Sequence, residues 1–238
     1  MPSTRAPDIK VISFDLDDTL WPLANTIATA EKHFFQFLSQ RCPKLLAYGN
    51  DKLLQHRREF FHNNPHLHHQ ISQLRIAATA ALLSQLGYRE ADLISEQAFE
   101  IFIRHRNAVT PYAATIDVLS TLKKHFRLIA ITNGNANLAH SGIGEYFDFC
   151  LSAEQLNASK PMAKPFQVAL EKTGVEPDQI IHVGDHIHHD IAGAIAQGWY
   201  TVWLDHGQTQ PSDIHPSAII HAIDELPDTI GTMIGRAL

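Results

Sequence analysis

The chain alternates between two kinds of hydrophobic pattern. Five short runs are almost continuously apolar, and each ends near a small or acidic residue: KVISFD (10–15), LIAITNG (128–134), FDFCLS (147–152), IIHVGD (180–185) and YTVWLD (200–205). Such runs are typical of strands that are covered on both faces, as in a parallel sheet. Between them, apolar residues recur at helical spacing over 113–126, 164–173 and 187–197. Strands and helices in alternation predict a doubly wound, Rossmann-like α/β fold.

Residues 21–109 interrupt this alternation. The segment contains no convincing strand, and its apolar residues recur every three or four positions, as in a helix. Turn signals divide the segment, which predicts four helices; they are Pro43, Asn63-Asn64-Pro65 and Gly87. We therefore expect a core formed by residues 1–20 and 110–238, and a helical domain of residues 21–109 inserted after the first strand.

Composition narrows the possible functions. The net charge is −6 and no basic block is present, which argues against nucleic acid as a partner. No apolar run approaches the roughly 18 residues that span a bilayer, so we expect no membrane partner either. Cys42 and Cys150 lie far apart and outside any C-x-x-C pattern. They are predicted to be free thiols in a reducing, cytoplasmic environment.

Polar side chains of a particular kind follow four of the predicted strands. They are Asp15, Asp17, Asp18 and Thr19 after the first, Thr132 and Asn133 after the second, Lys160 in the loop after the third, and Asp185 with Asp190 after the fourth. Ligands of open α/β sheets bind beyond the carboxyl ends of the strands. We therefore expect these side chains to meet at one pocket.

This set of side chains suits phosphoryl transfer. Carboxylates gathered at one point repel each other and favour a hard cation such as Mg²⁺, which prefers oxygen ligands. One carboxylate can attack phosphorus, while a second acid protonates the leaving oxygen and later activates water. A hydroxyl group and an ammonium group can neutralise the charge that spreads over the phosphoryl oxygens.

Four motifs resemble those of the haloacid dehalogenase superfamily of phosphohydrolases. They are DLDDT at 15–19, Thr132 after IAI, Lys160 in SKP, and GDHIHHD with Asp185 and Asp190. They occur in the order of that family, and each lies at a predicted strand end. The family also carries a helical cap between its first and second motifs, so the resemblance covers the whole chain. It implies a Mg²⁺-dependent phosphatase.

The resemblance also implies a role for each motif residue. Asp15 is expected to be the nucleophile and Asp17 the general acid and base. Asp15 and Asp185 are expected to bind Mg²⁺ through their side chains, and Asp17 through its backbone carbonyl. The remaining roles are phosphate binding by Thr132, Asn133 and Lys160, and orientation of metal waters or the lysine by Asp190.

Three features have competing interpretations. Lys164 also precedes a proline, but Lys160 lies at the family's usual distance before Asp185. Arg75 interrupts an apolar helical pattern and is the first candidate for a cap contact with an anionic substrate. The histidine-rich segments 62–69 and 182–189 match no established zinc spacing. The first is expected in a solvated loop. In the second, His186, His188 and His189 are expected at the border of the pocket, without binding metal.

The substrate is expected to be a small phosphorylated metabolite. DLDDTLW, AITNGNA and IIHVGD look most similar to a branch of phosphatases that act on FMN and riboflavin-pathway phosphates. Phosphoglycolate or a sugar phosphate is the alternative within the superfamily. Dehalogenase activity is disfavoured because dehalogenases lack the acid at the position of Asp17. A phospho-receiver signalling module is the alternative that is not an enzyme. No motif specifies the physiological substrate or the oligomeric state.

Overall fold

The computed structural model describes residues 6–207, 211 and 213–238. The chain divides into two compact units. The sheet unit comprises the chain up to Pro22, Thr110–Gly134 and Leu138–Leu238. The helical unit comprises Leu23–Val109, together with the short loop Asn135–Asn137.

The sheet unit is built on six parallel strands. They are β1 (Val11–Phe14), β2 (Arg127–Thr132), β3 (Phe149–Ser152), β4 (Ile180–Gly184), β5 (Tyr200–Leu204) and β6 (Ala218–Ile220). Their order across the sheet is β3-β2-β1-β4-β5-β6, and each neighbouring pair is parallel. The prediction of a doubly wound α/β core is confirmed. The short strand β6 was not predicted.

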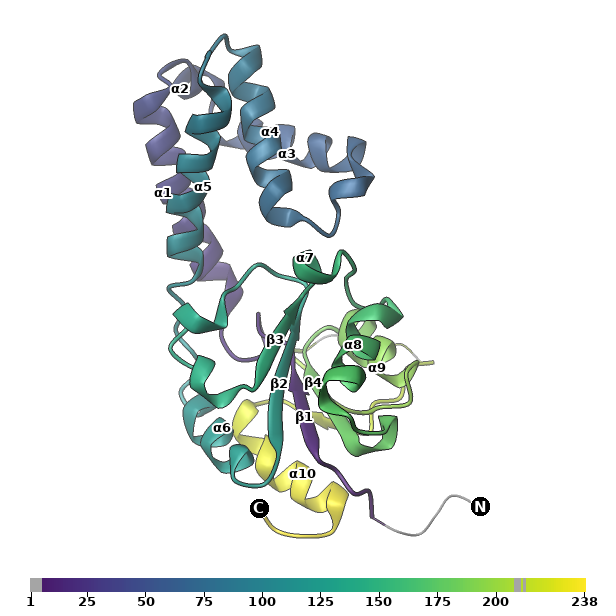
Figure 1. Cartoon of the computed structure of the whole chain (residues 1–238). Helices are drawn as coiled ribbons and strands as arrows, with labels where there is room; N and C mark the ends of the chain where they lie inside the picture. The colour runs from purple at the N-terminus through teal and green to yellow at the C-terminus, as the bar shows by residue number, and fades with distance from the viewer. Residues whose placement is uncertain (1–5, 208–210, 212) are drawn as a thin grey trace. The chain divides into compact units, whose positions relative to one another are not determined.

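Helices cover both faces of this sheet. They are α6 (Thr115–Lys123), α7 (Ala153–Leu156), α8 (Ala163–Thr173), α9 (Gly193–Ile195) and α10 (Leu226–Ile234). Helices α8 and α9 lie on one face, and α6 and α10 lie on the other (Figure 1). On the first face, Phe166 and Ala169 of α8 pack against apolar side chains of the central strands. This burial on both faces explains why the strand sequences are apolar without interruption.

Two predicted helices differ from expectation in detail. Helix α6 covers only part of 113–126, and the helix expected over 187–197 is a π-helix, Ile187–Ala192, followed by α9. His186 caps the start of the π-helix. Its Nδ1 accepts hydrogen bonds from the backbone N–H groups of His188 and His189 at 3.2 Å each. The described residues also form 3₁₀ turns at Pro65–Leu67, Leu138–His140, Gly144–Tyr146, Pro177–Gln179 and Ile223–Glu225.

The helical unit contains five α-helices rather than the four expected. They are α1 (Leu23–Arg41), α2 (Lys44–Tyr48), α3 (Asn50–Asn63), α4 (Ile71–Gln85) and α5 (Ala91–Arg106). The additional helix, α2, fits between two turn signals, Pro43 and Gly49, and Gly49 has the positive φ of 84° that favours glycine. Phe34, Leu38, Leu83, Ala98 and Phe102 belong to the buried core of this unit.

A charged cluster joins four of these helices. Glu31 of α1 accepts hydrogen bonds from Arg57 of α3 at 2.6 and 3.1 Å, and from Arg75 of α4 at 2.7 Å. The Arg75 guanidinium carbon lies 3.6 Å from the ring centroid of Phe102 in α5. Burial alone would raise the pKa of Glu31, but the two arginines outweigh it and hold that pKa below its usual value. Glu31 is therefore ionised near neutral pH.

We predict that Glu31→Gln destabilises the protein by about 2–3 kcal/mol at pH 7, because it leaves two arginines without their shared anion. The lowered pKa of Glu31 means that its contribution is present above the ordinary glutamate value. It is lost as the pH falls below about 4.5, where the unfolded chain binds the proton first. Urea unfolding followed by circular dichroism at pH 7 and pH 4 measures both effects.

Glu96→Gln is the matched control, because Glu96 is an exposed residue of α5 in the same unit. It should change the free energy of unfolding by no more than about 0.5 kcal/mol. A loss for Glu31→Gln that equals the control, or that stays unchanged at pH 4, would contradict the role given to the cluster.

Candidate active site

The topology places two acidic residues side by side. β1 and β4 are neighbours at the centre of the sheet, where the chain changes direction between its two halves. Asp15 follows β1, and its backbone N–H donates to the carbonyl of Val183 in β4 at 2.8 Å. Asp185 follows β4 directly. The two carboxylates therefore leave adjacent strands at the switch point, where open α/β sheets bind ligands.

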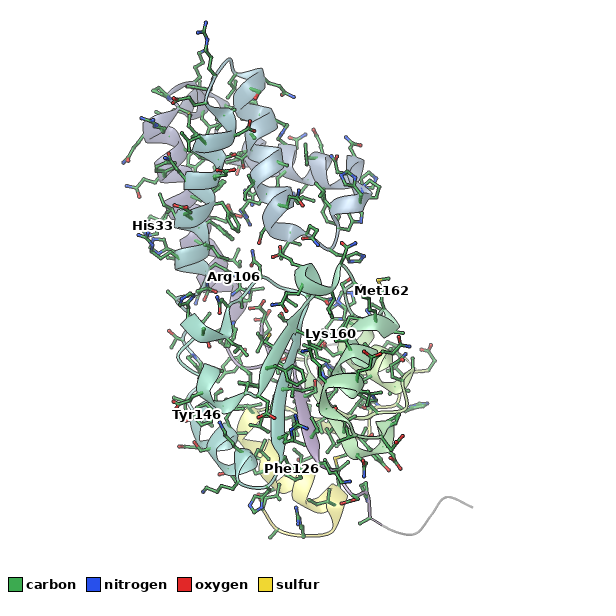
Figure 2. All side chains as sticks on the ribbon, in the orientation of Figure 1. His33, Arg106, Phe126, Tyr146, Lys160 and Met162 are labelled. Atoms are coloured by element: carbon green, nitrogen blue, oxygen red, sulfur yellow. The ribbon has the colours of Figure 1, made fainter. Side chains whose placement is uncertain are left out.

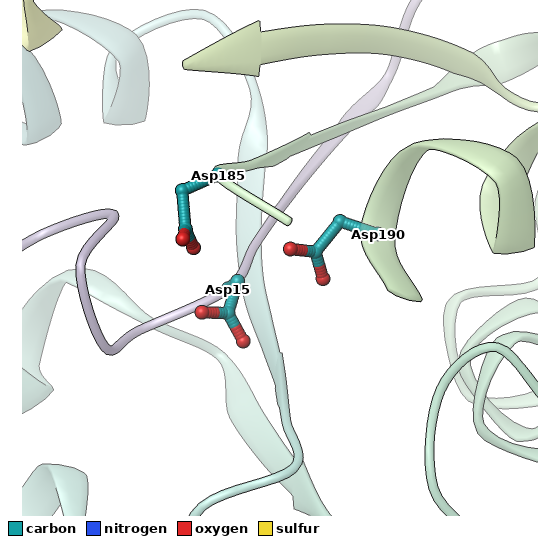
Figure 3. Close-up of side chains that lie close together, drawn as sticks. All are labelled: Asp15, Asp185 and Asp190. Atoms are coloured by element: carbon teal, nitrogen blue, oxygen red, sulfur yellow. The ribbon is translucent and has the colours of Figure 1, made fainter. Parts of the chain in front are cut away.

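A third carboxylate joins them from the π-helix. One oxygen from each of Asp15, Asp185 and Asp190 lies within 4.8 Å of the others, and Figure 3 shows the three side chains around one space. Gly184 permits this approach, because a Cβ atom there would lie 2.4 Å from Cγ of Asp190. Glycine at this position therefore has a steric cause.

Lys160 supplies a buried positive charge to this group. Its Nζ lies 2.6 Å from Oδ1 of Asp15 and 2.6 Å from Oδ1 of Asp190, and it also donates to the carbonyl of Ile131 at the end of β2. Only 2% of Lys160 is exposed. Figure 2 shows the residue beside the carboxyl ends of the strands.

Asn133 fixes the backbone of that lysine. Its Oδ1 accepts from the Lys160 N–H at 2.8 Å, and its Nδ2 donates to the Lys160 carbonyl at 2.9 Å. Both halves of the amide are thus used to tie the loop after β2 to the loop after β3.

The buried charges perturb one another. Burial alone would lower the pKa of Lys160, but the charges of Asp15 and Asp190 outweigh it and hold that pKa above the usual value. Burial would likewise raise the pKa of Asp190, yet Lys160 and His182 hold it well below the usual range. Asp15 behaves differently: burial raises its pKa well above the usual value, against the opposing effect of Lys160.

Asp185 also resists ionisation. Burial, followed by the charge of Asp190, raises its pKa to about 6. Its Oδ1 accepts a hydrogen bond from the Thr19 hydroxyl at 3.2 Å, and its backbone carbonyl accepts from the indole N–H of Trp203 at 2.8 Å. Lys160 bonds two of the three carboxylates, and the fully ionised group of Asp15, Asp185, Asp190 and Lys160 carries a net charge of −2.

The loop after β1 holds Asp17 in place. The indole N–H of Trp21 donates to Oδ1 of Asp17 at 2.9 Å, and the Asp18 N–H donates to the carbonyl of Trp21 at 2.8 Å. Asp18 adopts a left-handed conformation with φ of 57°. Its carbonyl accepts from Nε2 of His206 at 2.7 Å and from the hydroxyl of Tyr112 at 3.4 Å. Through these contacts, the backbone of Asp18 stabilises the conformation of the loop after β1.

The remaining site candidates are placed as follows. Thr132 is buried at the end of β2, and its Oγ1 accepts from the N–H of Gly134 at 3.0 Å, which leaves its hydroxyl hydrogen to donate. Lys164 is exposed to solvent and donates to the carbonyl of Leu156. Arg75 lies in the helical unit with its guanidinium against Glu31.

Several contacts of the site were not predicted from the sequence. Trp21 follows a recognised motif but carries no motif signal itself, and His206 lies almost 190 positions from the loop that it contacts. The sequence offered His182 only as one of four possible zinc ligands. It is fully buried beneath the site, between Ser13 and Asp190. Burial, the largest effect, lowers the pKa of His182.

Comparison with known proteins places this geometry in a family. The haloacid dehalogenase-like hydrolase family matches residues 9–198. The chain is 32% identical to the 5-amino-6-(5-phospho-D-ribitylamino)uracil phosphatase YigB of Escherichia coli K12, over 93% of this chain and 96% of that protein. It is 27% identical to the glyceraldehyde 3-phosphate phosphatase of Methanopyrus kandleri, over 92% and 91% of the two chains.

A solved structure is also similar over nearly the whole chain. The crystal structure of a 2-haloacid dehalogenase from Pseudomonas syringae pv. Tomato DC3000 is 36% identical, with a TM-score of 0.89, and covers 94% of this chain and 99% of that one. Both phosphatases and a dehalogenase are thus among the similar proteins. In the part of the chain that the structure describes, no helix is long and apolar enough to cross a membrane.

We predict that Asp185→Asn stabilises the metal-free protein by about 1–3 kcal/mol at pH 7. A raised folded-state pKa means that ionising Asp185 costs more in the folded protein than in the unfolded chain. This cost is complete above about pH 6 and disappears towards pH 4, so the gain should disappear there too. Asparagine keeps an oxygen for the Thr19 hydroxyl. Urea unfolding in the presence of a chelator, at pH 7 and pH 4, measures this change in the free energy of unfolding.

Asp178→Asn is the control, since Asp178 is an exposed aspartate of the same unit. Its free energy of unfolding should stay within about 0.5 kcal/mol of the unchanged protein. If Asp185→Asn destabilises the protein at pH 7, or stabilises it equally at pH 4, the electrostatic account of the site is wrong.

Proposed function

The chain belongs to the haloacid dehalogenase-like hydrolases and is a phosphatase of that family, and we propose that it is a Mg²⁺-dependent phosphomonoester hydrolase that forms an aspartyl phosphate on Asp15. One observation carries this proposal. The carboxylates of Asp15, Asp185 and Asp190 lie within 4.8 Å of one another, and the buried ammonium group of Lys160 bonds two of them, Asp15 and Asp190. A divalent cation and a phosphoryl group together fit that arrangement.

The donor set suits Mg²⁺. The carboxylates are hard oxygen ligands. Burial raises the pKa of both Asp15 and Asp185, so a bound cation would favour their ionised forms. Asp190 is occupied, since its oxygens accept from Lys160, His182 and the N–H of His186. Asp15 and Asp185 would therefore hold the cation through side chains, and Asp17 through its carbonyl. When bound, Mg²⁺ offsets the charge on the phosphoryl oxygens.

The first chemical step uses Asp15 and Asp17. A carboxylate oxygen of Asp15 attacks phosphorus, and the bond between phosphorus and the alkoxide oxygen of the substrate breaks. Asp17, held by Trp21, donates its proton to that leaving oxygen. Lys160 and the hydroxyl of Thr132 offset the charge on the equatorial oxygens. The products of this step are the free alcohol and Asp15 as a mixed anhydride with phosphate.

The second step restores the enzyme. Asp17, now ionised, takes a proton from a water molecule whose oxygen attacks phosphorus. The bond between phosphorus and the Asp15 oxygen breaks, and inorganic phosphate leaves. The separation of roles follows from chemistry: once Asp15 is esterified it can neither donate nor accept this proton, so a second carboxyl is required.

The helical unit is our candidate for the cap domain of residues 21–109. Arg75 is its proposed contact with an anionic substrate. Because its guanidinium is hydrogen-bonded to Glu31 and lies on Phe102, a substrate would have to compete with Glu31 for it. This makes Arg75 a selective contact, open only to a group that offers at least as strong an anion.

For the substrate, we propose a small metabolite with a primary phosphate, handled in the cytoplasm. The similarity to YigB over almost the full length of both chains supports 5-amino-6-(5-phospho-D-ribitylamino)uracil, a phosphorylated open-chain polyol on a pyrimidine. FMN carries its phosphate on a similar ribityl chain and is the next candidate. Cys42 and Cys150, both free thiols, support a reducing compartment.

Haloacid dehalogenation is the second candidate, because the similar Pseudomonas syringae structure is described as a 2-haloacid dehalogenase. Asp17 argues against it. A halide ion leaves without protonation, so dehalogenation gives no work to an acid held two residues beyond the nucleophile. A phosphate ester with an alkoxide leaving group does require such an acid.

The deciding experiment measures phosphate release from 5-amino-6-(5-phospho-D-ribitylamino)uracil, FMN, phosphoglycolate and sugar phosphates, with Mg²⁺ and with excess chelator. Halide release from 2-haloacids is measured in parallel. We expect Mg²⁺-dependent phosphate release and no halide release. Halide release that persists with chelator, without phosphatase activity, would replace the proposed function with dehalogenation.

We predict that Asp17→Asn lowers kcat for alkyl phosphates by about 10²–10⁴-fold, the usual value of general acid–base help. Asparagine preserves the shape, the contact with Trp21 through Oδ1 and the backbone carbonyl. Aryl phosphates have better leaving groups, so their first step should suffer less, and phosphoenzyme should accumulate. Acid-quenched single-turnover kinetics with detection of phosphate on Asp15 measures this.

Asp178→Asn serves again as the control and should leave kcat unchanged. Turnover of alkyl phosphates by Asp17→Asn at the rate of the unchanged enzyme would exclude Asp17 as the acid. If turnover of aryl and alkyl phosphates falls to the same extent and no phosphoenzyme accumulates, Asp17 acts on substrate or metal binding and not on proton transfer.

We further predict that Lys160→Ala lowers kcat by about 10²–10³-fold, as expected when one charge-assisted contact in a dry site is lost. Lys164→Ala should have less than a threefold effect, because Lys164 is exposed and its Nζ donates to the carbonyl of Leu156 at the end of α7. Both lysines precede a proline, which makes the pair well matched. Steady-state kinetics that show equal losses, or the reverse order, would place the phosphate-binding lysine at 164.

A further inference from the structure

A buried chain of polar groups continues from the site into the sheet. Ser13 of β1 and His182 of β4 are partners across the two central strands, and both are fully buried. The Ser13 hydroxyl lies 3.0 Å from Nδ1 of His182, and Nε2 of His182 lies 3.3 Å from Oδ1 of Asp190. The same carboxylate oxygen lies 2.6 Å from Nζ of Lys160. The chain thus runs from Ser13 to Lys160.

The direction of each hydrogen bond follows from the groups themselves. An ionised carboxylate can only accept, so Nε2 of His182 must carry the hydrogen that faces Asp190. In the neutral imidazole, Nδ1 then carries a lone pair and must accept from the Ser13 hydroxyl. The Asp190 carboxylate therefore selects the tautomer of His182, and the Ser13 hydroxyl, which can donate or accept, holds the ring in place by donating to Nδ1.

The surroundings leave these groups little freedom. The imidazole ring of His182 packs edge-on against Phe166 and Trp199, with centroid distances of 5.8 and 6.3 Å. On its other side, Asp190 presses against the backbone at Gly184 so closely that a Cβ could not be accommodated. The Asp190 carboxylate is held between the imidazole ring of His182 and the backbone of β4. Its position in turn fixes the position of the Lys160 ammonium group.

We propose that Ser13 and His182 are positioning residues for the reaction: through Asp190 they hold the ammonium group of Lys160 against Asp15 and the transferring phosphoryl group. The proposal depends on the proposed function in one respect, namely that Lys160 binds a phosphoryl group. Neither residue touches substrate. Without the donor from His182, the Asp190 carboxylate can turn, and the ammonium group follows it away from Asp15.

The kinetic test uses substitutions that remove one hydrogen at a time. Ser13→Ala removes the donor to Nδ1, and His182→Phe keeps a ring against Phe166 and Trp199 but loses the donor to Asp190. His182→Gln keeps an N–H near the position of Nε2. For an aryl phosphate with Mg²⁺, we expect kcat to fall about 3–10-fold for Ser13→Ala and 10–100-fold for His182→Phe, as for loss of a hydrogen bond to a neutral and a charged group. His182→Gln should recover most of that loss.

A double-mutant cycle separates positioning from general stability. Each change is repeated in the Lys160→Ala background, where Asp190 has no ammonium group to direct. We expect Ser13→Ala and His182→Phe to have less than a twofold further effect there. The same fold loss in both backgrounds would overturn the proposal, since it would mean that the residues act through folding. If His182→Phe does not fold, the Ser13→Ala cycle alone decides.

Ser141→Ala is the matched control, because Ser141 is a buried serine of the same unit whose hydroxyl donates to the carbonyl of Leu138. It should leave kcat within twofold of the unchanged enzyme. A loss for Ser13→Ala no larger than for Ser141→Ala would overturn the proposal, whatever the change in thermal stability.

A second measurement does not depend on catalysis. Nitrogen-15 NMR of the histidine rings should show His182 as a single Nε2–H tautomer in the unchanged protein, and a shifted Nδ1 resonance in Ser13→Ala, where the hydrogen bond to Nδ1 is lost. An Nδ1–H tautomer in the unchanged protein would overturn the proposal. If the enzyme releases no phosphate from any ester but His182 shows the expected tautomer, the proposed function fails while the hydrogen-bonded chain stands.

Discussion

The structure of the site depends on one buried ammonium group. Lys160 is almost completely enclosed and carries its charge against two carboxylates, at 2.6 Å from each. A buried lysine without such partners would lose its proton. Here the opposite occurs, because Asp15 and Asp190 together outweigh the cost of burial and keep the pKa of the lysine high. With its third bond, to the carbonyl of Ile131, this cation joins the ends of β1 and β2 to the π-helix.

Sharing the cation divides the carboxylates into two classes. Asp190 also receives hydrogen bonds from His182 and from a backbone N–H, so it is the fully satisfied partner and stays ionised. Asp15 and Asp185 receive less than they need, and the pKa of each is raised. A site whose charges balanced would be more stable and would attract a cation less strongly. The imbalance is therefore the physical basis of the proposed chemistry, and the fold bears its energetic cost.

Much of this arrangement could be predicted from the sequence, because it depends on strand ends. Asp15, Thr132 and Asp185 each follow an apolar run directly, and parallel strands bring their carboxyl ends together whatever the details of packing. The contacts of His182 could not be predicted in the same way. Its position is set by the register that pairs Ser13 with it across two strands 169 positions apart. A histidine inside an apolar run reads in sequence as a polar interruption and nothing more.

The elements that prediction missed have a similar explanation. Strand β6 has only three residues, too few to show a period, and it forms because β5 offers it an edge. Helix α2 depends on the positive φ of Gly49, which the sequence permits but does not require. The role of Asn133 was also hidden, because an asparagine after a strand reads as a turn residue. Its amide instead bonds the backbone of a residue 27 positions away.

Each unit contains a buried charge that bonds two groups of opposite charge. In the helical unit the net charge of the group is positive, and in the sheet unit it is negative. In the helical unit, Glu31 lies between Arg57 and Arg75, and the excess is positive. That excess is spread over a delocalised guanidinium on the ring face of Phe102, where the aromatic quadrupole stabilises it without a second anion. In the sheet unit, Lys160 bonds two of three neighbouring carboxylates, and the excess is negative and localised. A net charge that is delocalised and stabilised by an aromatic ring can be part of a stable core. A net charge that stays localised favours the binding of a ligand of opposite charge. By this criterion the chemistry belongs at the ends of β1 and β4, while the arginines of the helical unit serve first to hold that unit together.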